Sequence, residues 1–380
     1  MTELSFYVHI PYCIKRCGYC DFNTYTPNEL KDGASLETVS GDYIDAVLKE
    51  IDSAYLEAPG KVPTIFFGGG TPSLLPGKDL GRVISAIKQR WSVDDNCEIT
   101  LEANPDSVDE NKLQSFRDAG FNRISFGMQS AAPHVLATLD RTHNPANVER
   151  AVRSARNVGF SSISVDLIYG TPGETLEDWR ASVESALALK VDHISAYALI
   201  VESGTKLAGQ IKRKDISMPD DDLMADMYLL VDSLAQESGL SWYELSNWSK
   251  PGHESRHNIA YWKNANWWGL GPGAHSHLDG VRWFNVKHPN VYKSSLFEGK
   301  SPIHEREILT PSQIADEGIM LPIRMREGIL RKNLSQVQQS NAEPYTRSGH
   351  IDLEKWGQGT LQLTPQGRLI ADRIVRELVV

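Results

Sequence analysis

The first two hundred residues of the chain alternate between short, β-branched apolar runs and longer stretches of helical periodicity. This alternation predicts parallel strands joined by crossover helices, because two consecutive parallel strands need a long connection. Six strands are expected, at Phe6–Ile10, Thr64–Phe67, Ile99–Glu102, Arg123–Phe126, Ser162–Ile168 and His193–Ala198. The expected helices are Gly41–Tyr55, Pro76–Arg90, Asp109–Ala119, Pro145–Val158, Thr175–Ala188 and Asp220–Ser238. The sequence therefore predicts an α/β fold with a parallel sheet.

Polar residues gather where these strands end. In strand order they are Cys13, the run Gly68-Gly69-Gly70-Thr71, Glu102 with Asn104, Gln129, Asp166 and Tyr197. Chemistry in parallel α/β sheets and barrels takes place at the C-terminal ends of the strands. Functional residues at six successive strand ends therefore predict one shared site.

Length and charge limit what the chain can do. Its 380 residues, 41% of them hydrophobic, suffice for one large domain plus a smaller one, or for two or three ordinary domains. A net charge of −10 makes nucleic acid an unexpected partner. No run of 18 apolar residues predicts a membrane span, and no secretory signal is recognised. With only four cysteines, we expect a reducing, cytoplasmic setting.

Three of the four cysteines lie in one short segment, CIKRCGYC, as Cys13, Cys17 and Cys20. A structural zinc site and a simple electron-transfer cluster each take four protein ligands. Three thiolates leave one metal position open, so an iron-sulfur cluster held here could bind a substrate or cofactor directly. Zinc completed by His9 or another side chain, and thiols without a ligand, remain alternatives. Cys97 comes just before a strand and is expected to be a small buried side chain.

The character of the sequence changes after residue 238. Six of the nine tryptophans fall within residues 242–283, together with His253, His257, His275 and His277. From Thr310 on, the pattern predicts a small helical or winged α+β module that begins with a capping box. We expect a core at 1–238, a Trp/His-rich connecting region at 239–300 and a C-terminal module at 301–380.

The C-x3-C-x2-C segment, with Tyr19 before its last cysteine, and the GGGTPS run at residues 68–73 resemble radical S-adenosylmethionine enzymes. The resemblance implies a partial (β/α)6 barrel in the first part of the chain, followed by a smaller α+β, winged-helix-like module. It also implies that Cys13, Cys17 and Cys20 bind three irons of a [4Fe-4S] cluster. The amine and carboxylate of S-adenosylmethionine would then bind the fourth iron.

Further motifs narrow the resemblance: YVHIPYC, LEANP, RISFGMQS, LDRTH and SVDLIYGTPGET. They are similar to the subgroup that holds the oxygen-independent coproporphyrinogen III dehydrogenases and the HemW-type heme chaperones. The residues that this implies around S-adenosylmethionine are Tyr7, Tyr19, Gly69, Gly70, Thr71, Glu102, Gln129, Arg141, Asp166 and, where the spacing shifts between subgroups, Ala198.

Two departures favour the chaperones over the dehydrogenases. Phe22 stands where the dehydrogenases carry a fourth cysteine, and twelve residues precede Cys13 in place of a long extension. The segment HNIAYW, residues 257–262, matches the H-N-x-x-Y-W motif of the chaperones. By this resemblance His257 is the expected heme ligand, because heme iron takes imidazole and the porphyrin packs against aromatic walls. His253 and His275 are the next candidates.

The expected function is that of a heme chaperone with a [4Fe-4S] cluster and S-adenosylmethionine. It would transfer heme to an acceptor such as a respiratory cytochrome or oxidase, which requires transient membrane proximity when the acceptor lies in a membrane. One alternative is a coproporphyrinogen III dehydrogenase, which performs a radical oxidative decarboxylation in heme biosynthesis. The other is a radical enzyme that acts on an unrelated small molecule.

Overall fold

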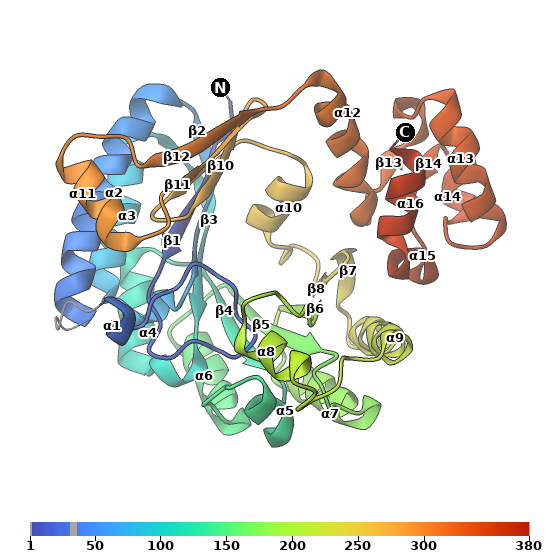
Figure 1. Cartoon of the computed structure of the whole chain (residues 1–380), viewed down its shortest axis with the longest axis horizontal. Helices are drawn as coiled ribbons and strands as arrows, with labels where there is room; N and C mark the ends of the chain where they lie inside the picture. The colour runs from blue at the N-terminus through green and yellow to red at the C-terminus, as the bar shows by residue number, and fades with distance from the viewer. Residues whose placement is uncertain (1, 31–35, 380) are drawn as a thin grey trace.

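A computed structural model describes residues 2–30 and 36–379, and its main feature is one curved sheet of twelve strands within those ranges (Figure 1). The strand order is β12-β11-β10-β9-β1-β2-β3-β4-β5-β6-β8-β7. The strands are β1 (Ser5–Ile10), β2 (Lys61–Gly69), β3 (Ser92–Ala103), β4 (Arg123–Gln129), β5 (Ser162–Tyr169), β6 (His193–Ala198), β7 (Ser241–Glu244), β8 (Asn247–Ser249), β9 (Trp267–Leu270), β10 (His275–Leu278), β11 (Val281–Asn285) and β12 (Ile303–Ile308).

The six predicted strands are confirmed as β1 to β6, all parallel and in chain order. Their apolar side chains form one large core with the covering helices. Two strands are much longer than predicted, because β2 starts at Lys61 and β3 at Ser92, where polar residues hide the strand pattern. The predicted partial (β/α)6 fold is present, and its C-terminal strand ends meet at one edge of the sheet.

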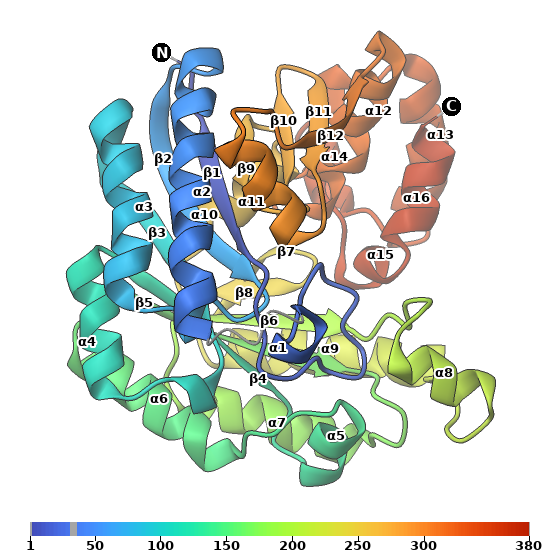
Figure 2. The same cartoon turned by 60° about the vertical axis from the view of Figure 1, so that its left-hand side comes forward.

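The predicted crossover helices cover the outer side of this sheet (Figures 1 and 2). They are α2 (Leu36–Glu57), α3 (Gly77–Arg90), α4 (Glu110–Ala119), α6 (Pro145–Asn157), α7 (Leu176–Ala188) and α9 (Asp221–Glu237). Side chains of Asp109, Asn144, Thr175 and Asp220 cap the first turns of α4, α6, α7 and α9. The loops also carry α1 (Pro27–Leu30), α5 (Pro133–Thr138) and α8 (Lys206–Lys212), which are too short for a periodic pattern.

The Trp/His-rich region extends the sheet beyond both ends of its parallel part. On one side β9 runs parallel to β1, and β10, β11 and β12 continue antiparallel. On the other side β8 is antiparallel to β6, and β7 is antiparallel to β8. Helix α10 (Arg256–Trp262) packs against β2, and α11 (Pro289–Phe297) packs against α2. The domain boundaries at 238 and 300 stay predictions, and β12 lies beyond the second of them in the same sheet.

The C-terminal module has a small core of its own around Ile323, Leu361 and Ile374. Its elements are α12 (Pro311–Met320), β13 (Ile329–Leu330), α13 (Gln336–Arg347), α14 (Leu353–Gly357), β14 (Thr360–Leu361), α15 (Pro365–Leu369) and α16 (Ala371–Leu378), shown in orange and red in Figure 1. A buried ion pair between Arg368 and Asp232 joins the module to α9, with one nitrogen–oxygen distance of 2.6 Å. No helix within the described residues combines the length and apolar character needed to cross a lipid bilayer.

Candidate functional site

The cysteine segment forms a loop that crosses the C-terminal edge of the strands. Backbone hydrogen bonds hold it at both ends, because Cys13 N–H donates to the Tyr25 carbonyl (3.1 Å) and Tyr25 N–H to the Pro11 carbonyl (2.7 Å). In the middle, Gly18 N–H donates to the Leu139 carbonyl, and the Gly18 carbonyl accepts from Leu207 N–H. The loop is therefore closed at its base and fixed to two other parts of the chain, at Leu139 and Leu207.

The three thiols are free and lie close enough to influence one another. Burial, together with the neighbouring thiolates of Cys17 and Cys13, raises the pKa of Cys20 to about 11. Cys13 accepts a hydrogen bond from Thr71 Oγ1 at 3.6 Å, and Cys17 accepts one from Arg141 Nη1 at 3.5 Å. Both donors stabilise thiolates, which is the form that binds iron.

Residues 2–30 and 36–379 hold no group of three His, Cys, Asp or Glu side chains arranged around one ion. Ligands of a single zinc ion must converge on one point. Thiolates that each bind a different iron of a cluster are spread over its corners. Cluster ligation by the three cysteines and the zinc alternative both stay predictions.

The glycine run at the end of β2 brings its backbone close to the first strand. Gly69 has φ = +108°, and a side chain there would collide with the ring of His9. His9 Nε2 bonds the Asn23 carbonyl (2.9 Å), so its Nδ1 accepts from the Tyr7 hydroxyl (2.9 Å). Burial lowers the pKa of His9 to about 4, which keeps the ring neutral. His9 thus fixes the direction of the predicted S-adenosylmethionine neighbour Tyr7.

Two carboxylates face each other from β3 and β5. Burial, together with the nearby charge of Asp166, raises the pKa of Glu102 to about 8. Gly69 N–H donates to Glu102 Oε2 (3.2 Å). Asp166 accepts from Ser195 Oγ (2.7 Å) and Ser125 Oγ (2.9 Å), while burial raises its pKa as well. A cation between the two carboxylates would relieve their repulsion.

Gln129 and Arg141 meet at a bulge at the end of β4. Gln129 is a non-glycine residue at φ = +62°, an uncommon conformation that re-aims its side chain. Any side chain at Gly127 would collide with the Gln129 amide and the Arg141 guanidinium. Arg141 Nη2 donates to the Gly127 carbonyl at 2.9 Å, while its Nη1 reaches Cys17. Arg141 therefore links the cysteine loop to the barrel, and its guanidinium could pair with a carboxylate.

Two further predicted residues complete this edge. Ala198 ends β6 opposite Tyr169 of β5. Tyr19 feels the charges of Cys17, Arg141, Cys20 and Asp166, and burial raises its pKa beyond that of an ordinary phenol. All the residues predicted around S-adenosylmethionine therefore lie along β1–β6 or on the loops at this edge.

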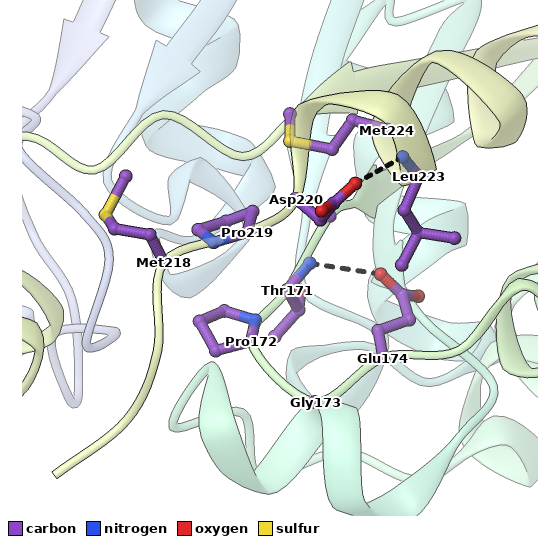
Figure 3. Close-up of a pocket in the computed structure, with 10 residues that line it drawn as sticks. Thr171, Pro172, Gly173, Glu174, Met218, Pro219, Asp220, Leu223 and Met224 are labelled. Atoms are coloured by element: carbon purple, nitrogen blue, oxygen red, sulfur yellow. Dashed lines mark hydrogen bonds between the residues drawn. The ribbon is translucent and has the colours of Figure 1, made fainter.

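The motif SVDLIYGTPGET builds a separate feature beside α7. A cavity of about 190 Å³ lies between Gly170–Glu174 and Met218–Met224, and none of the predicted site residues lines it (Figure 3). Thr171 N–H donates to Glu174 Oε2 at 3.1 Å, and burial raises the pKa of Glu174 to about 7. The turn after β5 is thus held by its own glutamate.

The side chains at the strand ends fit S-adenosylmethionine. The molecule carries an ammonium and a sulfonium, for which Glu102 and Asp166 offer opposite charge. Its ribose hydroxyls can donate to the same carboxylates, and its carboxylate can pair with the Arg141 guanidinium. Three unpaired thiols lie beside these groups. This donor set suits a cluster with one open iron next to a zwitterionic ligand.

The predicted heme ligand His257 lies in α10 and is only 2% exposed. Its Nδ1 bonds Thr64 Oγ1 (2.8 Å), and its Nε2 bonds the Tyr261 hydroxyl (2.9 Å). The ring also stacks on Phe66, with centroids 5.1 Å apart. Burial lowers its pKa to about 3. Ligation by His257 would require these contacts to open, and it stays a prediction.

The other two candidate histidines lie far apart. The backbone carbonyl of His253 accepts a hydrogen bond from Arg123 Nη1 (2.8 Å). Because Arg123 begins β4, His253 lies at the N-terminal end of that strand. His275 is exposed on β10, and its ring stacks on Phe284 of β11 with centroids 5.2 Å apart. Only His275 of the two lies in the part of the sheet that adjoins β1.

Sequence reasoning missed several supporting residues. Ser125 and Ser195 hold Asp166, and His9 holds Tyr7. A weak signal was available for Ser195, which lies on the next predicted strand at the position opposite Asp166. Phe284 gave no signal, because its contact with His275 depends on the antiparallel register of β10 and β11.

Comparison with known proteins places the chain in a family. The model of the radical SAM superfamily matches residues 7–186. The heme chaperone HemW of Mycobacterium tuberculosis (strain ATCC 25618 / H37Rv) is 43% identical over 376 residues, which cover 98% of this chain and 94% of the relative. The chain belongs to the HemW family. HemW of Bacillus subtilis (strain 168) is 32% identical, with 97% of both chains covered, so the resemblance seen in the motifs is confirmed.

The fold has a solved counterpart. Coproporphyrinogen III oxidase (HemN) from Escherichia coli, a radical SAM enzyme, superposes with a TM-score of 0.83 over 100% of this chain and 90% of the other. At 21% identity this likeness shows the shared fold. Membership of the radical SAM superfamily implies a [4Fe-4S] cluster and S-adenosylmethionine as cofactors, and the HemW relationship supports heme as a third ligand.

Proposed function

We propose that this HemW-family chain binds heme together with a [4Fe-4S] cluster and S-adenosylmethionine, and hands the heme to an acceptor protein. The observation that carries the proposal is the 43% identity with a heme chaperone over nearly the full length of both chains. Such coverage includes the aromatic strands β9–β12 as well as the parallel core. The acceptor class we propose is a respiratory cytochrome or oxidase, reached from the cytoplasm through transient contact at a membrane.

Cys13, Cys17 and Cys20 would hold the cluster, which supplies one open iron and one-electron chemistry when bound. The surrounding residues would orient S-adenosylmethionine. Tyr7, fixed by His9, and the backbone at Gly69, Gly70 and Thr71 face its amino-acid end, while Gln129 and Ala198 lie at the same edge. Glu102, Asp166 and Arg141 supply the charges described above.

Phe22 supports the chaperone over the dehydrogenase. This side chain is 61% exposed on the cysteine loop, at the position where the resemblance expects a fourth cysteine in the dehydrogenases. An exposed phenyl ring supplies neither a ligand nor a redox group. The dehydrogenase remains the second candidate, because the HemN likeness shows that this fold accommodates that enzyme.

An anaerobic titration of the reconstituted protein with hemin, followed by absorbance, tests the proposal. We expect saturation near one heme per chain. Absence of specific binding would overturn the chaperone function. Incubation of the same protein with coproporphyrinogen III, S-adenosylmethionine and a reductant tests the second candidate. Formation of protoporphyrinogen IX would favour the dehydrogenase, and no turnover is expected.

A further inference from the structure

The histidines of the chain differ in whether a ring nitrogen is available. Both ring nitrogens of His9, His257 and His277 are hydrogen-bonded to neighbouring residues. His143 and His193 are buried and bonded as well. Within the described ranges, His275 and His304 are exposed, carry no ring hydrogen bond and lie on the extension of the sheet next to β1.

His275 lies on the inner face of the sheet, on the same side as the predicted S-adenosylmethionine residues. Trp267 pairs with Ser5 of β1 and with His277 of β10. Paired residues share one face of a sheet, and so do residues two positions apart on the same strand. His277 and His275 therefore lie on the same face as Ser5 and Tyr7. The opposite face is filled, because Trp268 and Trp283 pack edge to face at 4.9 Å in the core.

The row of side chains through His275 contains one glycine and ends on an aromatic ring. Across neighbouring strands the row runs from Phe284 through His275 to Gly269 and Tyr7. Gly269 contributes no side chain, and a Cβ atom there would collide with the His275 carbonyl, so the backbone of β10 lies close over this glycine. On the other side, the Phe284 ring lies nearly parallel to the imidazole, at an interplanar angle of 22°.

The cysteine loop is attached directly beside this row. Asn23 Nδ2 donates to the carbonyls of Pro272 (3.0 Å) and Lys287 (2.8 Å), which flank β10 and β11. Lys287 is exposed, and its charge acts on His275. A planar ligand on His275 would therefore have an ammonium group near its edge and the cluster loop as its neighbour.

We propose that His275 is the axial ligand of the heme iron, with Phe284 packed against the porphyrin and Lys287 paired with a propionate. This inference rests on the proposed heme binding and names its site. An exposed imidazole with free nitrogens can coordinate iron without unfolding any element. An aromatic ring beside it supplies the apolar contact that a porphyrin face needs. His304 lies on the outermost strand, β12, with its ring 5.3 Å from Phe284, and is the rival ligand.

The test is a hemin titration of the full-length protein and of four variants: His275→Ala, His304→Ala, His257→Ala and, as a control on the distant helix α5, His134→Ala. We expect His275→Ala to weaken heme binding on the order of tenfold or more and to change the Soret and spin-state spectra. His134→Ala should match the wild type. In His275→Gly, added imidazole should restore the wild-type spectrum. His275→Gln, which keeps the size of the side chain, repeats the test should the alanine variant melt early.

Each other outcome has a distinct meaning. If the wild type binds heme and His275→Ala binds it equally well with the same spectrum, the ligand assignment is wrong while the proposed function stands. The ligand assignment is also wrong if His304→Ala or a well-folded His257→Ala loses heme binding while His275→Ala keeps it. If the wild type itself binds no heme, the proposed function fails and the assignment falls with it.

Discussion

The inner surface of the sheet has two halves with different chemistry. The ends of β1–β6 carry thiols, two carboxylates and a guanidinium, while the β9–β12 extension carries imidazoles, the Trp267 indole and Phe284. The first half suits a small zwitterion and a metal cluster, and the second suits a flat apolar ring with a metal at its centre. We infer that the two ligands are bound by separate surfaces joined through Asn23, so that each half can be disabled alone.

Replacing Cys13, Cys17 and Cys20 with alanine should disable the first half completely. We expect loss of the iron-sulfur absorbance and of iron and sulfide content, since three of the cluster ligands are removed. Heme affinity should stay within about twofold of the wild type, because His275 is untouched. Metal and sulfide analysis with a parallel hemin titration measures both effects.

Cys97→Ala is the matched control for the triple variant. Its thiol is buried on β3, 4% exposed, and its sulfur lies 3.8 Å from the Glu98 carbonyl. This variant should keep the full cluster content. Unchanged iron and sulfide in the triple variant would overturn the cluster assignment, and parallel loss of heme would show that the two halves are one site.

The junction between the halves depends on Glu50 of α2. Its carboxylate accepts from Gly271 N–H (2.9 Å), Asn285 Nδ2 (2.7 Å) and the Tyr292 hydroxyl, which position the strands of the extension. Burial raises the pKa of Glu50 from 4.5 to about 7. The folded state therefore keeps a proton between pH 4.5 and 7 that the unfolded state has lost, so stability falls as the pH rises through this window.

The Glu50→Gln variant should lose this part of the pH dependence. A shift of that size corresponds to about 3 kcal/mol of unfolding free energy between the two ends of the window. Urea unfolding at pH 4.5 to 7.5 measures it, and the variant should show a shallower slope than the wild type. Identical slopes would show that Glu50 does not carry the effect. Glu57→Gln, an exposed carboxyl at the end of the same helix, serves as the control.

Glu102→Gln should weaken the first half without affecting the second. The amide keeps the shape of the side chain but cannot ionise, whereas the Glu102 carboxyl, whose pKa is raised to about 8, is expected to lose its proton when a cation binds beside it. We expect S-adenosylmethionine affinity to fall on the order of tenfold, as measured by anaerobic calorimetry on cluster-loaded protein, with heme affinity unchanged. Asp95→Asn changes an exposed carboxyl at the other end of β3 and should leave both affinities as they are. Equal affinity in Glu102→Gln would exclude Glu102 from the site.

The two halves also differ in how far the sequence predicts them. Parallel strands bring their C-terminal ends to one edge by topology, so Glu102, Asp166 and Arg141 could be assigned to one site from motif and strand order alone. The extension depends on antiparallel pairing between short strands, in which one residue of slip moves a side chain to the opposite face. The contact of His275 with Phe284, and the burial of His257 under Tyr261, follow from that register and from the docking of α10. No local pattern encodes either.

Thr64→Val tests the smallest expected effect, at the border between the halves. Thr64 Oγ1 donates its hydrogen to Ser5 Oγ (2.9 Å), so it can only accept a hydrogen bond from His257. The His257 Nδ1–H therefore donates to Thr64, and the His257 Nε2 accepts from the Tyr261 hydroxyl. Valine has nearly the same shape but leaves the buried Nδ1–H without a partner, which should cost about 1 kcal/mol of unfolding free energy. Thr64→Ser keeps the hydroxyl and should recover most of this loss. If His257 has a structural role, hemin affinity stays constant in both variants. A change in hemin affinity that follows the hydroxyl would instead make His257 part of the heme site, because altering its hydrogen bond would then alter a ligand.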